Sequence, residues 1–281
     1  MMRGKLSVNL LLKANFFRLW RSASFWVAMA VMAAVSLVEL GLSAHAVGQG
    51  IPVPLENRYA IFALITGIVL SAFCSLFIGE EYSSGAVRNQ ITAGHSRAAV
   101  YLANLAVCAA AGAMACFAYI LPLLAGGIPI MGPFTQSWQS VIWFTVCAVI
   151  MTAALCAVFT LIAMLNQNKA VTAVISITTA YFLLFLGIYL NNRLTEQAVI
   201  PAREYVENGR IMVQAAMPNP AYVQGVKRIC FEILYCIPGC QAVQLLEEMK
   251  ACPIRLPLAS LGTAAASALV GAAAFRRKDL K

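Results

Sequence analysis

The 281-residue chain has few charged side chains: Asp, Glu, Lys and Arg make up 11% of it, whereas hydrophobic residues make up 61%. Soluble domains carry roughly 25% charged and 45–50% apolar residues. A chain of this size cannot hide so much apolar surface from water. The composition therefore excludes an ordinary soluble enzyme, a disordered protein and a nucleic-acid-binding domain, despite a formal net charge of +9.

Catalytic and nucleotide-binding motifs are also missing. No Gly-x-x-x-x-Gly-Lys-(Ser/Thr) segment occurs, so we do not expect this chain to bind or hydrolyse nucleotide itself. The two histidines, His45 and His95, form no His-Glu-x-x-His motif, which excludes a zinc protease. We expect no catalytic residue, metal site or cofactor in this chain.

Long apolar runs are what the sequence has instead. A helix needs about 20 mostly apolar residues to span a membrane. Six runs qualify; five contain no charged side chain and the first contains only Glu39. They predict an all-α polytopic membrane protein with six transmembrane helices. The runs cover residues 25–42, 59–78, 98–125, 138–165, 170–190 and 256–275.

The distribution of Lys and Arg predicts the orientation. Short loops rich in Lys and Arg stay in the cytoplasm. The short loops on the side without the termini carry only Arg58, and seven further basic residues lie in the long segment 191–255. We therefore expect both termini in the cytoplasm, and a multi-pass protein of a bacterial plasma membrane. The terminal side carries Arg3, Lys5, Lys13, Arg18, Arg21, Arg88, Arg97, Lys169, Arg276, Arg277, Lys278 and Lys281.

Residues 5–22 predict an amphipathic helix at the inner membrane interface, before the chain turns at Ser24. This helix is either a lipid anchor or a docking surface for a cytoplasmic partner, and Asn15, Arg18 and Arg21 are its candidate contacts. The apolar face holds Leu12, Phe16, Leu19 and Trp20, and the opposite face holds Asn15, Arg18 and Ser22 with Arg21 beside them.

The cytoplasmic loop 79–97 predicts a second, shorter helix. Gly85 interrupts the chain, residues 86–93 can form about two helical turns, and Gly94 supplies a left-handed stop. Ser96 can then cap the third span. A short helix held between two spans can transmit a push into the membrane; the alternative is a solvated connection with ordinary interfacial charges.

Four segments carry a resemblance to a known family. They read Phe-Ile-Gly-Glu-Glu-Tyr-Ser-Ser-Gly-Ala-Val-Arg-Asn at 77–89, Ala-Gly-His-Ser-Arg at 93–97, Asn-Pro-Ala-Tyr-Val-Gln-Gly at 219–225 and Phe-Arg-Arg-Lys-Asp-Leu-Lys at 275–281. In this order and with six spans, they resemble the permease subunits of ABC exporters of the ABC-2 type. Position 86 is Ala where Thr is frequent in that family.

The resemblance implies that loop 79–97 is a coupling helix seated on a cytoplasmic ABC ATPase, with the N-terminal helix as a second contact. ATP and Mg²⁺ would bind to that partner. It also implies that two permeases, either identical or related chains, pair around a central path. The implied ATPase contacts are Glu80, Glu81, Gly85, Arg88, Asn89, Gly94 and Arg97.

The nearly uncharged spans indicate an apolar path. An ATP-driven exporter with such a path would move an amphiphilic or hydrophobic substrate, such as an antimicrobial peptide, a drug or a lipid, by alternating access. The alternative is a non-transporting membrane sensor or scaffold that docks a cytoplasmic partner. Glu39 is either a pathway residue or a carboxylate that reaches water or pairs with Arg58.

Four regions follow: the cytoplasmic N-terminus 1–24, spans one to five at 25–190, the outer segment 191–255, and the last span with its basic tail at 256–281. Prolines divide the outer segment, which we expect to form two or three short helices that cap the bundle and dip in part into the membrane, as a lid or a shield. Related exporters carry such a helical re-entrant element before the last span. Its cysteines are candidates for a disulfide, with three pairings open: Cys230, Cys236, Cys240 and Cys252.

Overall fold

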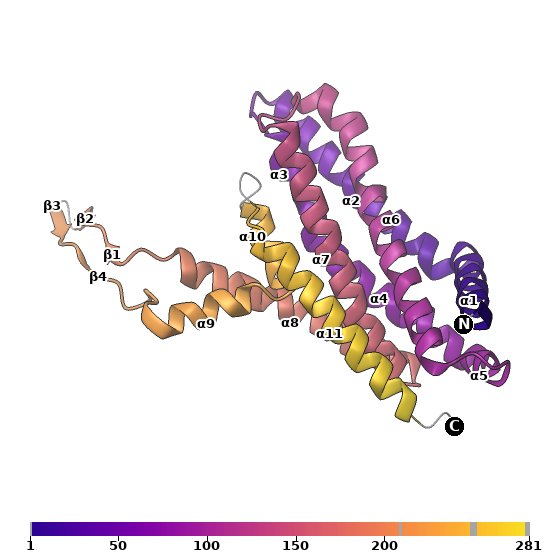
Figure 1. Ribbon diagram of the computed structural model, residues 1–281. Coiled ribbons are helices and arrows are strands. Elements are labelled where there is room, and N and C mark those ends of the chain that lie inside the picture. The colour runs from indigo at the N-terminus through magenta and orange to yellow at the C-terminus, as the bar shows by residue number, and fades with distance from the viewer. Residues whose placement is uncertain (1, 208–209, 248–251, 279–281) are drawn as a thin grey trace.

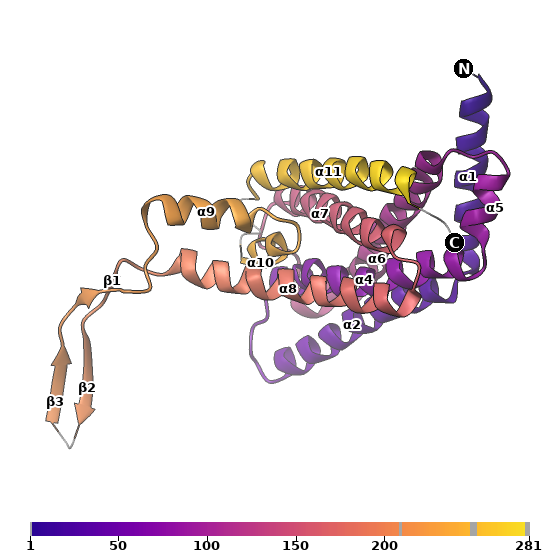
Figure 2. The ribbon, with the colours of Figure 1, turned by 90° about the horizontal axis from the view of Figure 1, so that it is seen from below.

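A computed structural model describes residues 2–207, 210–247 and 252–278, and Figure 1 shows its arrangement. Long helices form a bundle, and both termini lie at the same end of it (Figures 1 and 2). The helices are α1 (Met2–Arg21), α2 (Ala23–Gly48), α3 (Leu55–Tyr59), α4 (Ile61–Ser83), α5 (Ala86–Thr92), α6 (Arg97–Met131), α7 (Trp138–Leu165), α8 (Lys169–Thr195), α9 (Gly225–Tyr235), α10 (Cys240–Glu247) and α11 (Arg255–Arg277).

Each of the six expected spans corresponds to a helix long and apolar enough to cross a membrane: α2, α3 with α4, α6, α7, α8 and α11. The polytopic all-α fold class is therefore confirmed. α4, α6 and α7 form the buried centre, whereas α2, α8 and α11 keep wide apolar faces exposed. In a membrane those faces meet lipid or another protein.

Aromatic side chains fill the centre near the end opposite the termini. Phe62 of α4 and Phe144 of α7 pack edge to face, with ring centroids 5.9 Å apart. Tyr59 of α3 packs against Phe134 in the loop before α7, at 5.3 Å. At the same end, the buried Glu56 carboxylate accepts hydrogen bonds from Oγ1 of Thr135 (2.7 Å) and from the backbone N–H groups of Thr135 and Gln136. This carboxylate therefore ties α3 to the α6–α7 loop.

α1 lies across the end of the bundle, separated from α2 by a one-residue break at Ser22 (Figure 2). The expected N-terminal helix is thus present, but its buried and exposed faces differ from the expected ones. Asn15 is buried and only 2% exposed, whereas Trp20 is 51% exposed. The reason is tertiary: α1 packs on α6, which offers a polar partner to Asn15.

The segment before α11 differs in part from the expected short helices. The helices α9 and α10 are present and bent by 92° to each other, the geometry of a re-entrant element or a broken span. Between α8 and α9, however, an arm of paired strands projects away from the bundle (Figure 1). Its antiparallel ladders pair β1 (Val199–Ile200) with β4 (Met217–Pro218) and β2 (Arg203–Glu207) with β3 (Arg210–Gln214).

Candidate functional site

The short helix α5 lies between two left-handed glycines. Gly85 has φ +73° and Gly94 has φ +91°, a region that residues with a Cβ rarely adopt. Ser96 then caps α6, because its hydroxyl accepts a hydrogen bond from the Ala99 N–H at 3.2 Å. The expected helix, its stop and the cap of the third span are therefore all present.

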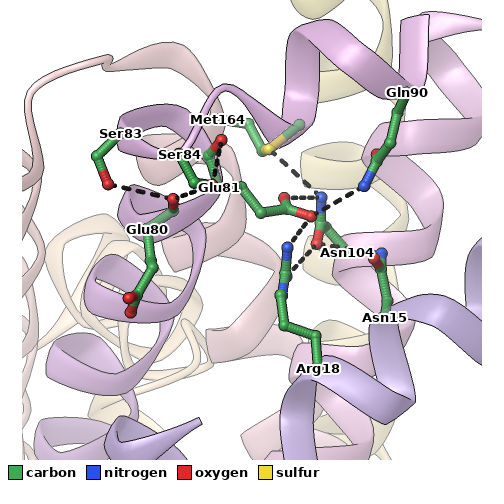
Figure 3. Close-up of polar contacts among 9 residues, drawn as sticks. All are labelled: Asn15, Arg18, Glu80, Glu81, Ser83, Ser84, Gln90, Asn104 and Met164. Carbon is green, nitrogen blue, oxygen red and sulfur yellow. Dashed lines mark hydrogen bonds and ion pairs between the residues drawn. The ribbon is translucent and has the colours of Figure 1, made fainter. Parts of the chain in front are cut away.

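A buried carboxylate, that of Glu81 near the end of α4, lies at the centre of a group of polar side chains (Figure 3). Its Oε1 forms an ion pair with Nη1 of Arg18 from α1, and its Oε2 accepts a 2.6 Å hydrogen bond from Nδ2 of Asn104 in α6. The Glu81 side chain is fully buried and that of Arg18 is 26% exposed. Burying a carboxylate costs several kcal/mol unless it is paired and hydrogen-bonded, and both conditions are met here.

Asn104 extends the contacts of Glu81 into a network. Its Oδ1 accepts hydrogen bonds from Nη2 of Arg18 (3.2 Å) and Nδ2 of Asn15 (3.3 Å). The Arg18 guanidinium also lies over the ring of Phe77, 4.0 Å from its centroid. Side chains from α1, α4 and α6 are therefore joined in one buried cluster.

Gln90 connects α5 to this cluster. Its Nε2 donates a hydrogen bond of 3.3 Å to Oε1 of Glu81, the same oxygen that pairs with Arg18. Val87 on the same side of α5 is buried. Polar contacts therefore connect α5 to the carboxylate at the end of α4 and, through it, to α1 and α6. We call Asn15, Arg18, Glu81, Gln90 and Asn104 the polar hub.

The opposite side of α5 faces outward. Arg88 and Asn89 are exposed, as are Glu80 at the end of α4 and Gly94 after α5. A cleft of about 490 Å³ adjoins this surface. Its lining comes from the end of α4, from α5 and from the α7–α8 loop: Tyr82, Ser83, Ser84, Gly85, Val87, Arg88, Asn89 and Gln167.

The predicted contact residues thus divide into two groups. Glu80, Gly85, Arg88, Asn89 and Gly94 lie at the α5 surface, and Arg21 is exposed on α1. Glu81, Asn15 and Arg18 instead belong to the polar hub, and Arg97 bonds to backbone carbonyls at the end of α11. Sequence reasoning missed Gln90 and Asn104. For Asn104 the available signal was an amide inside an apolar run, where such a side chain usually hydrogen-bonds to a neighbouring helix.

At the other end of the bundle, Glu39 of α2 pairs with Arg58 of α3. Glu39 Oε2 lies 2.8 Å from Nη1 of Arg58, and their side chains are 17% and 28% exposed. Tyr119 of α6 donates a 2.8 Å hydrogen bond to the Arg58 carbonyl. This geometry favours the interpretation of Glu39 as a structural carboxylate that joins the two helices.

The four outer cysteines are not joined by disulfides in this structure. Cys230 is exposed on α9, whereas the Cys240 thiol donates a 3.3 Å hydrogen bond to the Leu183 carbonyl of α8. The Cys252 thiol is hydrogen-bonded with Cys147 of α7. The outer cysteines therefore sit in different packing environments.

Six helices long and apolar enough to cross a membrane define a polytopic membrane protein. At one end of the bundle, α1 and the short helix α5 are joined by a buried cluster that contains an ion pair. Residues 11–185 match the model of the ABC-2 family transporter proteins. This match covers more than half of the chain, which therefore belongs to the ABC-2 transporter family as a permease subunit. No curated protein matches the chain.

Proposed function

We propose that this chain is the membrane-spanning subunit of an ATP-driven exporter and that a separate ATPase docks on the surface formed by Glu80, Arg88, Asn89 and Gly94. The supporting observation is the two-sided character of α5. Its inner side is bonded to the polar hub through Gln90, and its outer side presents Arg88 and Asn89 beside a cleft. A partner that pushes on α5 therefore acts on three further helices.

Arg21 and the exposed part of α1 supply a second contact for the ATPase. α1 and α5 are joined through Glu81, because Arg18 and Gln90 both bind its Oε1. ATP and Mg²⁺ bind to the partner, where the hydrolysis of ATP supplies the energy. Closure of two ATPase copies would move both helices together and switch the path between inward-facing and outward-facing states.

The character of the spans supports an amphiphilic or hydrophobic cargo, such as an antimicrobial peptide, a drug or a lipid. The buried centre formed by α4, α6 and α7 is mostly apolar. Its buried polar groups are the polar hub and a few hydroxyls, of which those of Thr66 and Ser75 bond to helix carbonyls. The acid in the first span is already neutralised by Arg58. An inorganic ion would require polar groups near the middle of the membrane.

Two permeases, either two copies of this chain or this chain and a related one, would enclose the path. The wide exposed apolar faces of α2, α8 and α11 support such pairing, since they bury little surface within one chain. The positive-inside rule supports a cytoplasmic location for α1, α5 and both termini, where an ATPase of a bacterial cell can reach them.

The test is co-purification and ATP hydrolysis with the ATPase encoded by a neighbouring reading frame. Arg88→Glu should weaken the affinity of the ATPase by about tenfold or more, equivalent to about 1.4 kcal/mol. The substitution should not unfold α5, because an acid in the first turn of a helix is favourable. Arg277→Glu, a charge reversal of an exposed arginine on α11 at the same end, is the matched control and should bind normally.

The outcome also separates the exporter from a sensor or scaffold. An exporter requires that the ATPase activity of the complex depends on this chain and drives uptake of an amphiphilic dye into inside-out vesicles. ATPase binding without either effect would favour the scaffold. No binding by the wild-type chain, or equal binding by Arg88→Glu and Arg277→Glu, would contradict the proposed docking surface.

A further inference from the structure

The last turn of α11 is bonded to three other helices at the terminal end. Nη1 of Arg97, the first residue of α6, donates hydrogen bonds to the carbonyls of Arg276 (3.2 Å) and Lys278. The last four carbonyls of a helix have no partner within the helix. Arg97 therefore satisfies carbonyls at the end of α11, where the helix dipole also favours a cation.

Lys278 makes the reciprocal contact. Its Nζ donates hydrogen bonds to the Met164 carbonyl (2.9 Å) and to the Tyr82 hydroxyl (3.2 Å), and it lies over the Tyr82 ring, 4.5 Å from the centroid. Met164 is the penultimate residue of α7, so its carbonyl also lacks a helical partner. Tyr82 donates to the same carbonyl at 2.6 Å.

These bonds place α11 beside the proposed coupling segment. Tyr82 directly follows Glu81 of the polar hub and lines the cleft next to α5. Arg97 begins the helix that directly follows the loop after α5. Met164 contacts both the polar hub and Lys278. Its sulfur lies 4.0 Å from Nδ2 of Asn104, and its carbonyl accepts a hydrogen bond from Lys278.

We propose that Arg97 and Lys278 are positioning residues that make α11 move with the coupling segment 79–97. Together with Tyr82 and Met164 they form a C-terminal clip, and the last span receives the displacement of α5 through it. This role rests on the proposed function. It also gives Arg97 a task other than direct contact with the ATPase.

The first experiment needs no ATPase. Hydrogen exchange is measured on the full chain in nanodiscs for wild type, Arg97→Gln, Lys278→Met and the control Arg277→Gln. If the clip joins the two regions, amides in both the last turn of α11 and segment 79–97 should exchange about fivefold faster or more in the two clip variants, the lower end of ordinary coupling energies. Arg277→Gln should exchange like wild type, since its side chain is exposed.

Faster exchange confined to the end of α11 would mean a local cap only and would overturn the proposal. Unchanged exchange at both places would overturn it as well. Neither result depends on whether an ATPase binds, so the clip can fail while the exporter assignment stands, and the reverse.

The second experiment uses the complex with the ATPase. ATP should change the exchange of both regions in wild type, but only that of 79–97 in Lys278→Met, with ATP hydrolysis retained. If ATP still changes the hydrogen exchange of the last turn of α11 in Lys278→Met as it does in wild type, the clip is refuted. A wild-type complex in which ATP alters neither region would count against the proposed function, while the first experiment still decides the clip.

Discussion

Nδ2 of Asn104 lies 2.6 Å from Oε2 of Glu81, so an amide in the third span holds a carboxylate at the end of the second. The two residues are 23 positions apart in sequence and both are buried. Their bond makes the polar hub part of the packing between α4 and α6. Through Gln90 the same carboxylate is also bonded to α5, a helix of about two turns.

Removal of the positive charge that faces Glu81 should destabilise the folded protein. Arg18→Gln leaves a carboxylate with no exposed surface and without its counter-charge, which should lower the free energy of unfolding by about 3 kcal/mol. Arg21→Gln, an exposed neighbour on the same helix, should change it by less than about 0.5 kcal/mol. Denaturant unfolding in micelles measures both, and equal effects would contradict the role given to the buried pair.

The double variant Arg18→Met, Glu81→Met tests whether the loss comes from the unpaired charge. Replacement of both members by apolar groups often costs little, because no charge is left buried. We therefore expect the double variant to be more stable than Arg18→Met alone. If the losses in the free energy of unfolding caused by Arg18→Met and by Glu81→Met simply add in the double variant, the ion pair is not the source of the stability.

The local features of this site could be predicted from sequence, whereas its contacts could not. Glycines at 85 and 94 and the serine at 96 fix the ends of α5 and the start of α6 through short-range rules. The face of α1 depends on Asn104, 89 positions after Asn15, and no helical periodicity carries that information. The amphipathic pattern therefore placed Asn15 on the outside.

The arm of paired strands shows a different limit of prediction from the sequence. Its prolines favour breaks between helices, whereas the pair Asn208-Gly209 is a sequence typical of tight hairpin turns and favours strands on either side. The C-terminal clip had no sequence signal at all. A lysine one residue beyond a span is expected at any cytoplasmic helix end, and only the fold brings it to Met164.

The Glu39–Arg58 pair should be dispensable for transport. The two side chains are partly exposed, and such pairs contribute about 1 kcal/mol or less. Glu39→Gln should therefore lower stability slightly and leave the transport rate of reconstituted protein unchanged. A normal unfolding curve together with a tenfold or greater loss of transport would instead make Glu39 a pathway residue.

The contact between α6 and α11 should not tolerate a methyl group at Gly271. A Cβ there would overlap the hydroxyl and ring of Tyr101, whose hydroxyl donates a 3.2 Å hydrogen bond to the Ser267 carbonyl. Gly271→Ala should lower the free energy of unfolding by about 1–3 kcal/mol, because the two helices must separate. Gly262→Ala on the same helix meets nothing within 4 Å and should be neutral or stabilising. Similar melting temperatures for the two variants would contradict this packing.

Lys278 should make stability depend on pH above neutrality. Burial lowers the pKa of its amine from 10.5 to about 8. Between about pH 8 and 10.5 the unfolded chain therefore binds more protons at this site than the folded chain, so the contribution of Lys278 to stability rises with pH across that window. At pH 7 most molecules keep the ammonium that bonds to Met164 and Tyr82.

The measurement compares melting temperatures of wild type and Lys278→Gln from pH 7 to 10. Other groups titrate in both proteins, so the difference between the two curves isolates Lys278. Wild type should gain stability relative to the variant as the pH rises, whereas Arg277→Gln should follow wild type throughout, because an arginine does not titrate in this range. A constant difference between wild type and Lys278→Gln would show that the amine is not buried at the end of α7.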